Sequence, residues 1–308
     1  MFDISIKSSD TEEFLDLWFY RPLGFRRALF FRNRGIHPNV VTIISIVLGG
    51  AAGICFYQET LRWNVLGVLL LMWANLYDST DGQLARITGQ KTRWGRILDG
   101  FAGDCWFFCI YFALAARETF QPIPFAPEYQ WGVLIWILCS FCGFWVHGSQ
   151  CQLADYYRNI HLYFIKGKSG SELDNFRSVR EQYHQTPWIG NWAWKVFLYS
   201  YSNYTRSQER LSPNFQAFFR KAKHRFGEEL PEALRRDFRA GSLPLMKYTN
   251  ILTFNTRAIT LYVCLLVGEP WLYFVFELTV MNALLLYMRY KHEDLCQKLL
   301  NQLDTYEN

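Results

Sequence analysis

The sequence lacks several features that mark common classes of protein. It contains no internal repeat and no low-complexity tract, and no segment matches a nucleic-acid-binding motif, so binding to DNA or RNA is not expected. The excess of basic residues is small, with 32 Lys and Arg against 27 Asp and Glu. The amino-terminal region is charged and amphipathic without a compact apolar core, which predicts that no signal peptide is cleaved from it.

Cysteine pairs with the spacing of a metal site are also scarce. Among eight cysteines, only Cys139 and Cys142 have C-x-x-C spacing, and they lie in an apolar stretch without a second pair or a histidine at ligand spacing. We therefore expect most cysteines to be small buried residues that pack helices.

Long apolar segments are what the sequence has in abundance. Hydrophobic residues make up 51% of the chain, and the 12 Trp and 18 Tyr are typical of belts at a membrane surface. Stretches of roughly 17–25 apolar residues are long enough to cross a bilayer. The sequence therefore predicts an all-α polytopic membrane protein with about six spans: Val40–Tyr57, Asn64 to about Asp81, Gly95–Ala116, Trp131–Arg158, Ile251–Val267 and Trp271–Tyr290.

The polar segments divide this chain into regions. Residues 1–36 are expected to form an amphipathic helix on the membrane surface, and residues 37–158 hold the first four spans. Residues 159–246 are too polar to span and are expected to form a cytoplasmic or interfacial helical insertion. Residues 247–292 hold the last two spans, and residues 293–308 form a tail. The distribution of Lys and Arg places both termini on the cytoplasmic side.

Three carboxylates lie where two predicted spans approach the membrane surface. Asp78 and Asp81 are three residues apart and share one helix face, and Asp99 can approach them from the next helix. Acidic side chains at the end of a membrane helix are costly and rare, so this cluster indicates a functional site. Oxygen ligands favour Mg²⁺ or Mn²⁺ over zinc. Two such ions can bridge a diphosphate and activate an incoming hydroxyl.

The residues beside these acids suit a phosphate-bearing ligand. Gly82 and Ala85 continue the same face with almost no side chain, which lets a bulky ligand approach the backbone. Arg86 adds a fixed positive charge for phosphate. Isolated helix caps or interfacial charges would not account for this combination.

This pattern, Asp-x2-Asp-Gly-x2-Ala-Arg-x8-Gly-x3-Asp, resembles the signature of the class I CDP-alcohol phosphatidyltransferases. The Pro38-Asn39-x2-Thr42 segment is also similar to that family, which implies that Asn39 and Thr42 help to bind the donor. The resemblance implies a homodimeric membrane enzyme that holds a CDP-linked donor through two metal ions, while an acceptor hydroxyl attacks the β-phosphorus and releases CMP. The matching residues are Asp78, Asp81, Gly82, Ala85, Arg86, Gly95 and Asp99.

One position departs from the family pattern. The signature continues Asp-x3-Asp, and its last Asp is the general base. That position is Gly103 here, and the next carboxylate is Asp104. One residue corresponds to a rotation of about 100° on a regular helix. A single-turn π-bulge near Gly100 and Gly103 would restore the direction of the side chain. We therefore predict that Asp104 is the fourth metal-binding carboxylate and acts with Asp99 in catalysis.

Polar residues near the ends of later helices are candidates for binding the acceptor. Arg257 lies within an otherwise apolar run and is expected to face a cavity rather than lipid. Together with Arg158, Lys166 or Lys168, and with the nearby Asn255, it could bind a phosphorylated acceptor such as inositol phosphate or glycerol phosphate.

Three alternatives stay open. The donor could instead be CDP-choline or CDP-ethanolamine with a lipid alcohol as acceptor, or the chain could bind a CDP-lipid without catalysis. A membrane transporter is a third possibility, because intramembrane Asp and Arg also mark ion paths, although such proteins usually contain internal repeats.

Glu277 and Asn282, inside the last predicted span, are expected to hydrogen-bond between helices. His147 is expected to pack or to line a cavity.

Overall fold

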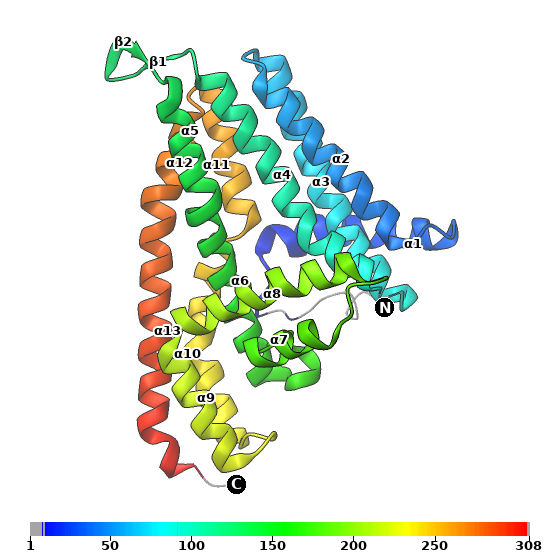
Figure 1. The fold of residues 1–308 in the computed structure, drawn as a ribbon, viewed down its shortest axis with the longest axis vertical. Coiled ribbons are helices and arrows are strands. Elements are labelled where there is room, and N and C mark those ends of the chain that lie inside the picture. Colours follow the sequence, from blue (N-terminus) through cyan, green and yellow to red (C-terminus); the bar gives the residue numbers. More distant parts are fainter. Residues whose placement is uncertain (1–7, 9, 91, 307–308) are drawn as a thin grey trace. The chain divides into compact units, whose positions relative to one another are not determined.

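The structure is a computed structural model that describes residues 8, 10–90 and 92–306. It is almost entirely helical, which confirms the predicted all-α class (Figure 1). Within the described residues the only strands are β1 (Pro122–Ile123) and β2 (Ala126–Gln130), which pair antiparallel in a short hairpin. The chain divides into two compact units. Of the described residues, unit 1 holds 12–148 and 255–280, and unit 2 holds the remainder.

Unit 1 carries the predicted motif. A π-helical turn (Asp16–Tyr20) leads into α1, and two further π-helical turns, Cys142–His147 and Glu277–Met281, follow α5 and α12. The helices of this unit are α1 (Arg21–Asn33), α2 (Pro38–Tyr57), α3 (Leu61–Thr88), α4 (Arg93–Glu118), α5 (Gly132–Phe141), α11 (Phe254–Val267) and α12 (Trp271–Phe276).

Local signals set the ends of the helices that hold the motif. Helix α2 begins at Pro38, which suits the first helical turn because it has no N–H to satisfy. Helix α3 ends at Gly89, whose φ of +70° is easily adopted only by a residue without a side chain. Helix α4 begins after Thr92, whose hydroxyl accepts a hydrogen bond from the Gly95 N–H at 2.9 Å.

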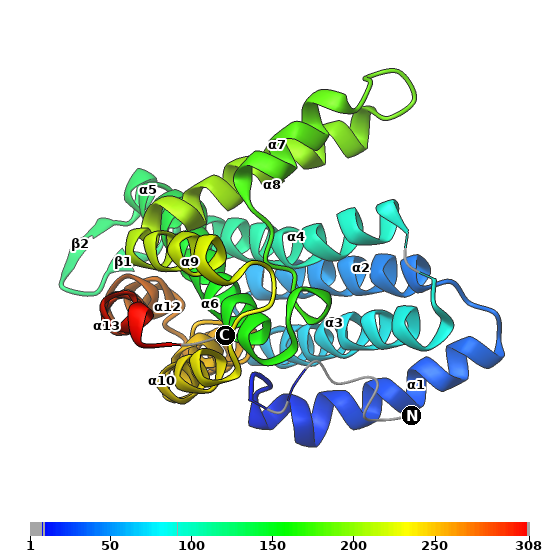
Figure 2. The same ribbon diagram turned by 90° about the horizontal axis from the view of Figure 1, so that it is seen from below.

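Small residues allow α2 to lie close to both α3 and α4 (Figure 2). A Cβ at Gly49 would lie 2.1 Å from the ring of Trp106 on α4, and one at Gly53 would lie 3.0 Å from the backbone of Cys109. On the other side of α2, Phe56 occupies the space that a side chain at Gly67 of α3 would need. The three helices therefore pack at close range, and they carry every residue of the predicted motif.

In the part of the chain that the structure describes, five helical stretches are long and apolar enough to cross a membrane, which indicates an integral membrane protein. Helix α3 has the length of a sixth span, but polar residues such as Asn64 and Asn75 interrupt its apolar run, and it is not among the five. The five stretches are Pro38–Tyr57, Arg93–Glu118, Gly132–Lys166, Glu232–Val267 and Trp271–Thr305.

Unit 2 is a helical body with an aromatic core. Phe164, Phe218 and Phe238 stack on one another, with ring centroids 3.7 Å apart for Phe164 and Phe238. Helices α9 (Pro213–Phe226) and α10 (Glu232–Ile251) pack against α13 (Asn282–Gln302), and α7 (Phe176–Gln185) pairs with α8 (Trp192–Leu211) (Figure 2). The predicted insertion 159–246 is thus part of a larger unit. Its helices are α6 (Gly148–Lys166), α7 (Phe176–Gln185), α8 (Trp192–Leu211), α9 (Pro213–Phe226), α10 (Glu232–Ile251) and α13 (Asn282–Gln302).

Candidate metal centre

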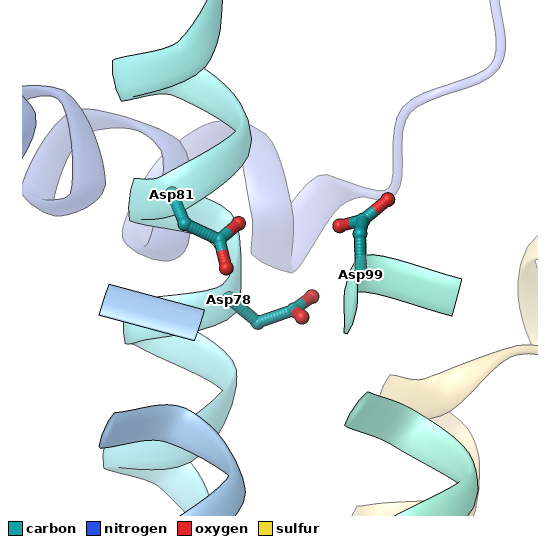
Figure 3. Close-up of side chains that lie close together, drawn as sticks. All are labelled: Asp78, Asp81 and Asp99. Carbon is teal, nitrogen blue, oxygen red and sulfur yellow. The ribbon is translucent and has the colours of Figure 1, made fainter. Parts of the chain in front are cut away.

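Three carboxylates from two helices converge in unit 1. Asp78 and Asp81 project from α3, and Asp99 projects toward them from α4 (Figure 3). One ligand oxygen from each residue lies within 4.8 Å of those of the other two. Asp78 and Asp81 lie within the last three turns of α3, and Asp99 lies about two turns into α4. The close packing of α2 between these helices brings their acidic ends together.

The burial of Asp81 shows that this group suits a cation. Asp81 is 2% exposed, and its Oδ2 atom has no hydrogen-bond partner among the described residues. Thr42 of α2 lies near this carboxylate, and its hydroxyl donates a hydrogen bond to Pro38 O at 3.3 Å. A buried carboxylate oxygen without a donor is unusual, and two further carboxylates beside it complete an all-oxygen ligand set. Mg²⁺ and Mn²⁺ prefer this kind of ligand.

Residues predicted to bind the donor lie around these acids. A Cβ at Gly95 would lie 3.0 Å from Oδ1 of Asn39, so the glycine lets the start of α2 approach α4. A Cβ at Gly82 would be 3.5 Å from the guanidinium of Arg86, while Ala85 is half-buried one turn further along α3. The Nε of Arg86 has no hydrogen-bond partner among the described residues. It is therefore available to an anion beside the acidic group.

Asp104 does not belong to the group of three carboxylates. Helix α4 is α-helical over its whole length from Arg93 to Glu118, so the π-bulge that would turn Asp104 toward Asp99 is not present. The Asp104 side chain is exposed. The bulge was expected because Gly100 and Gly103 permit it, but a permissive backbone does not impose a bulge where the regular helix is also unstrained.

Arg257 lies in the core of unit 1. The residue is fully buried, and its guanidinium pairs with the fully buried carboxylate of Glu277. His147 Nδ1 lies 3.1 Å from Arg257 Nη1, and the hydroxyls of Tyr111 and Tyr273 donate hydrogen bonds to Glu277. This arrangement does not support the predicted acceptor role of Arg257, because its guanidinium is turned toward a carboxylate in the core. Glu277 joins helices as predicted.

The pairing of Arg257 with Glu277 could have been expected from the sequence. The two residues are opposite charges on consecutive, otherwise apolar spans. A charge that is buried in such a setting needs a partner, and the neighbouring span offers one of opposite sign.

The remaining predicted acceptor residues fall into two groups. Asn255, in unit 1, donates hydrogen bonds to Glu13 at 2.7 Å and to Asp16 at 3.1 Å. The others belong to unit 2: Arg158 donates to Asn250 at 3.2 Å, and Lys166 and Lys168 are exposed. Their role in binding an acceptor stays a prediction.

Arg21, near the metal centre, was not singled out in the sequence. It begins α1, which packs on α3 where a Cβ at Gly24 would lie 2.8 Å from Nε2 of Gln83. The Arg21 side chain pairs with Glu12 at 3.0 Å and is close enough to Asp78 to act on its charge. No pattern in the sequence marks this proximity, because it depends on how α1 docks against α3.

Comparison with known proteins finds a family match over this part of the chain. Residues 35–159 match the family model described as CDP-alcohol phosphatidyltransferase, a range that includes every residue of the three-carboxylate group. No solved structure gives a significant match to the chain.

Curated relatives resemble shorter parts of the chain. An uncharacterized protein of Aquifex aeolicus is 39% identical over 70 residues, which are 23% of this chain and 34% of the relative. A CDP-diacylglycerol–glycerol-3-phosphate 3-phosphatidyltransferase of Rickettsia felis is 29% identical over 87 residues, which are 28% of this chain and 48% of the relative. A phosphatidylinositol phosphate synthase of Streptomyces avermitilis is 32% identical over 73 residues, which are 23% of this chain and 29% of the relative. The chain thus spans less than half the length of each of these relatives.

Proposed function

We propose that this chain, whose residues 35–159 match the CDP-alcohol phosphatidyltransferase family model, transfers a phosphatidyl group from CDP-diacylglycerol to an alcohol and releases CMP. The observation that carries the proposal is the convergence of Asp78, Asp81 and Asp99 within 4.8 Å, beside the unpartnered Nε of Arg86. Carboxylates alone would suit many cations. An arginine next to them suits a ligand that is both metal-bound and phosphorylated.

The donor diphosphate would lie between the acids and the arginine. Asp78, Asp81 and Asp99 would hold two Mg²⁺ or Mn²⁺ ions, which when bound would offset the charge of the diphosphate and activate the acceptor hydroxyl. Arg86 would bind a phosphate oxygen. Gly82 and Ala85 would leave room for the donor along α3. Asn39, Thr42 and Gly95 lie at the same end of the site and would also help to bind the donor.

The transfer step is a substitution at phosphorus. The acceptor hydroxyl oxygen forms a bond to the β-phosphorus of the donor, and the bond from that phosphorus to the bridging oxygen breaks. The bridging oxygen leaves with its electron pair as part of CMP. A carboxylate accepts the hydroxyl proton, and we assign this role to Asp104, which lies on α4 five residues beyond Asp99.

The acceptor is proposed to be a phosphorylated polyol, such as glycerol phosphate or inositol phosphate. Two relatives support this choice through their names, one a glycerol-3-phosphate phosphatidyltransferase and the other a phosphatidylinositol phosphate synthase. The basic residues Arg158, Lys166 and Lys168 provide charge of the sign that a second phosphate would need.

The position of the enzyme in the membrane follows from its charges. The Lys and Arg bias supports an arrangement with both termini and the metal centre on the cytoplasmic side, at the cytoplasmic membrane if the cell is a bacterium. We also propose that the protein works as a homodimer surrounded by membrane lipids, as the family resemblance implies.

Incubation of the purified protein with CDP-diacylglycerol, Mn²⁺ and a panel of alcohols tests this function. The proposal expects metal-dependent release of CMP with one class of phosphorylated alcohol, read by mass spectrometry of the lipid product. Asp78→Ala should abolish both release and metal-dependent binding of the donor. CMP release only from CDP-choline with diacylglycerol as acceptor would favour the other donor class. Binding of the donor without CMP release would indicate a catalytically silent family member. Solute uptake into vesicles without CMP release would favour a transporter.

A further inference from the structure

Unit 2 contains a groove that the proposed chemistry does not use. It lies between α10 and α13 and has a volume of about 410 Å³, which is in the range of sites for small ligands. We propose that this groove binds the headgroup of an anionic phospholipid. The proposal rests on three properties of the groove: apolar lining residues, a positive rim and a position near the ends of two spans predicted from the sequence.

The apolar lining residues lie where two helices meet at close range. A Cβ at Gly241 of α10 would lie only 2.3 Å from Cδ1 of Leu295 on α13, so the glycine allows this contact. Pro244 lies inside α10 and has no N–H for the helical hydrogen bond. Together with Leu245, these residues line a surface that suits hydrocarbon rather than a fully hydrated ion.

The rim is positive and not neutralised by the protein. It has three lysines and one carboxylate, and the carboxylate, Asp294, pairs with Lys298 at 2.7 Å. Among the described residues, no carboxylate lies within ion-pair distance of Lys247 or Lys291. These two lysines lie instead over tyrosine rings, Lys247 at 4.9 Å from the centroid of Tyr248 and Lys291 at 5.8 Å from that of Tyr287. The charges of Lys247 and Lys291 can therefore pair with a bound anion.

The place of these residues along the chain distinguishes a lipid from a soluble phosphate. Tyr248 lies three residues before the predicted span Ile251–Val267, and Tyr287 lies in the last turn of the predicted span Trp271–Tyr290. The two rings touch, with their centroids 5.1 Å apart. Tyrosine is enriched where a membrane helix leaves the hydrocarbon, and lysine just beyond that level attracts anionic headgroups. The groove therefore faces the depth at which phospholipid phosphates lie.

Native mass spectrometry of the purified full-length protein in detergent tests the proposal. The protein is titrated with dioleoylphosphatidylglycerol or with dioleoylphosphatidylcholine, and the retained lipid is counted. We expect phosphatidylglycerol to bind more tightly, and Lys247→Gln/Lys291→Gln to weaken it by about tenfold or more, given the usual contribution of a lysine near an anionic surface. A photoactivatable phosphatidylglycerol should crosslink to peptides that contain residues 241–248 or 287–298.

A matched control separates the groove from the overall charge. Lys221→Gln/Lys223→Gln removes the same charge from α9, where the lysines pair with Asp304 and Glu228, and should leave binding unchanged. The proposal is overturned if the groove variant binds phosphatidylglycerol as tightly as the unaltered protein, or if phosphatidylcholine binds equally well. Crosslinks confined to other helices would also overturn it. Displacement of the lipid by millimolar glycerol phosphate would do the same, because it would identify a site for a soluble anion.

Discussion

Asp81 combines nearly complete burial with a carboxylate oxygen that has no partner among the described residues. Without a cation, three negative charges within 4.8 Å repel one another and disfavour the folded state. When a cation is present, the same three carboxylates bind it. The residue therefore has opposite effects on stability in the two conditions, and this contrast can be measured without any substrate.

We predict that Asp81→Asn lowers the stabilisation of the folded protein by bound metal but does not destabilise the metal-free form. Mn²⁺ at 100 times its dissociation constant should stabilise the unaltered protein by about 2.7 kcal/mol, and the variant by far less. Thermal unfolding in detergent with EDTA or Mn²⁺ measures both effects. Asp304→Asn, which removes an exposed carboxylate, is the control and should keep the full response. An equal Mn²⁺ response in Asp81→Asn would remove this residue from the metal centre.

Asp104 is tested by comparison with Asp99, five residues before it on α4. We predict that Asp99→Asn abolishes both metal-dependent stabilisation and turnover. Asp104→Asn should keep the stabilisation by Mn²⁺, because Asp104 is outside the group of three, and should lower turnover by roughly 10²–10⁴-fold as the loss of a general base does. The two readouts are unfolding temperature and the rate of CMP release. Unchanged turnover in Asp104→Asn would assign the base elsewhere.

At the scale of the helices, the metal centre depends on the close approach of α2 to α4. We predict that Gly49→Ala destabilises the protein by about 1–3 kcal/mol, because the added carbon would overlap the buried ring of Trp106. The neighbouring Gly50→Ala is the control. Its Cβ would meet nothing nearer than Cys109 Sγ at 3.9 Å, so it should be neutral or gain the better helix propensity of alanine. Unfolding in detergent compares them, and equal midpoints would contradict the packing.

The pairing of Arg257 on α11 with Glu277 after α12 gives a second prediction at this scale. Arg257→Met leaves the Glu277 carboxylate buried without its charge partner, which typically costs about 3–5 kcal/mol. The double variant Arg257→Met/Glu277→Gln removes both charges and keeps an oxygen for the hydroxyls of Tyr111 and Tyr273. It should recover most of the loss. A double variant as unstable as the single one would show that the guanidinium acts through packing rather than charge.

For the whole molecule, the side on which the termini lie depends on α3. The five stretches that satisfy both length and apolarity would place the two termini on opposite sides, whereas a sixth crossing by α3 places them on the same side. At about 1.5 Å per residue, the 28 residues of α3 reach about 42 Å, which exceeds the hydrocarbon thickness of roughly 30 Å. Its polar end carries Asp78 and Asp81, and it is the helix as a whole that is long enough for the bilayer core.

We therefore predict that epitope tags at both ends are accessible from the cytoplasmic side of sealed vesicles. A tag inserted in the hairpin of β1 and β2, between α4 and α5, should be accessible only from the other side. Antibody binding to right-side-out and inside-out vesicles measures this. Termini on opposite sides would mean that α3 does not cross the membrane, and the arrangement of the metal centre at the cytoplasmic surface would need revision.

The helical class, the apolar spans and the members of the acidic motif could all be derived from the sequence. These properties depend on short-range patterns: runs of apolar residues of sufficient length, and residues such as Asp78 and Asp81 at a spacing that places them on one helix face. The Arg257 and Glu277 pair was within reach of the same reasoning, because buried opposite charges on neighbouring spans need each other.

Other properties were decided only by the packing of helices that are distant in the sequence. The regular path of α4 through Gly103 keeps Asp104 outside the group of three carboxylates, and the docking of α1 brings Arg21 close enough to Asp78 to act on its charge. The groove between α10 and α13 is lined by residues of both helices, and Gly241 allows the close approach of Leu295 there. Local sequence sets which faces of a helix are apolar, polar or small, but the distance and rotation between two helices depend on side chains from both, and these appear only in the folded protein.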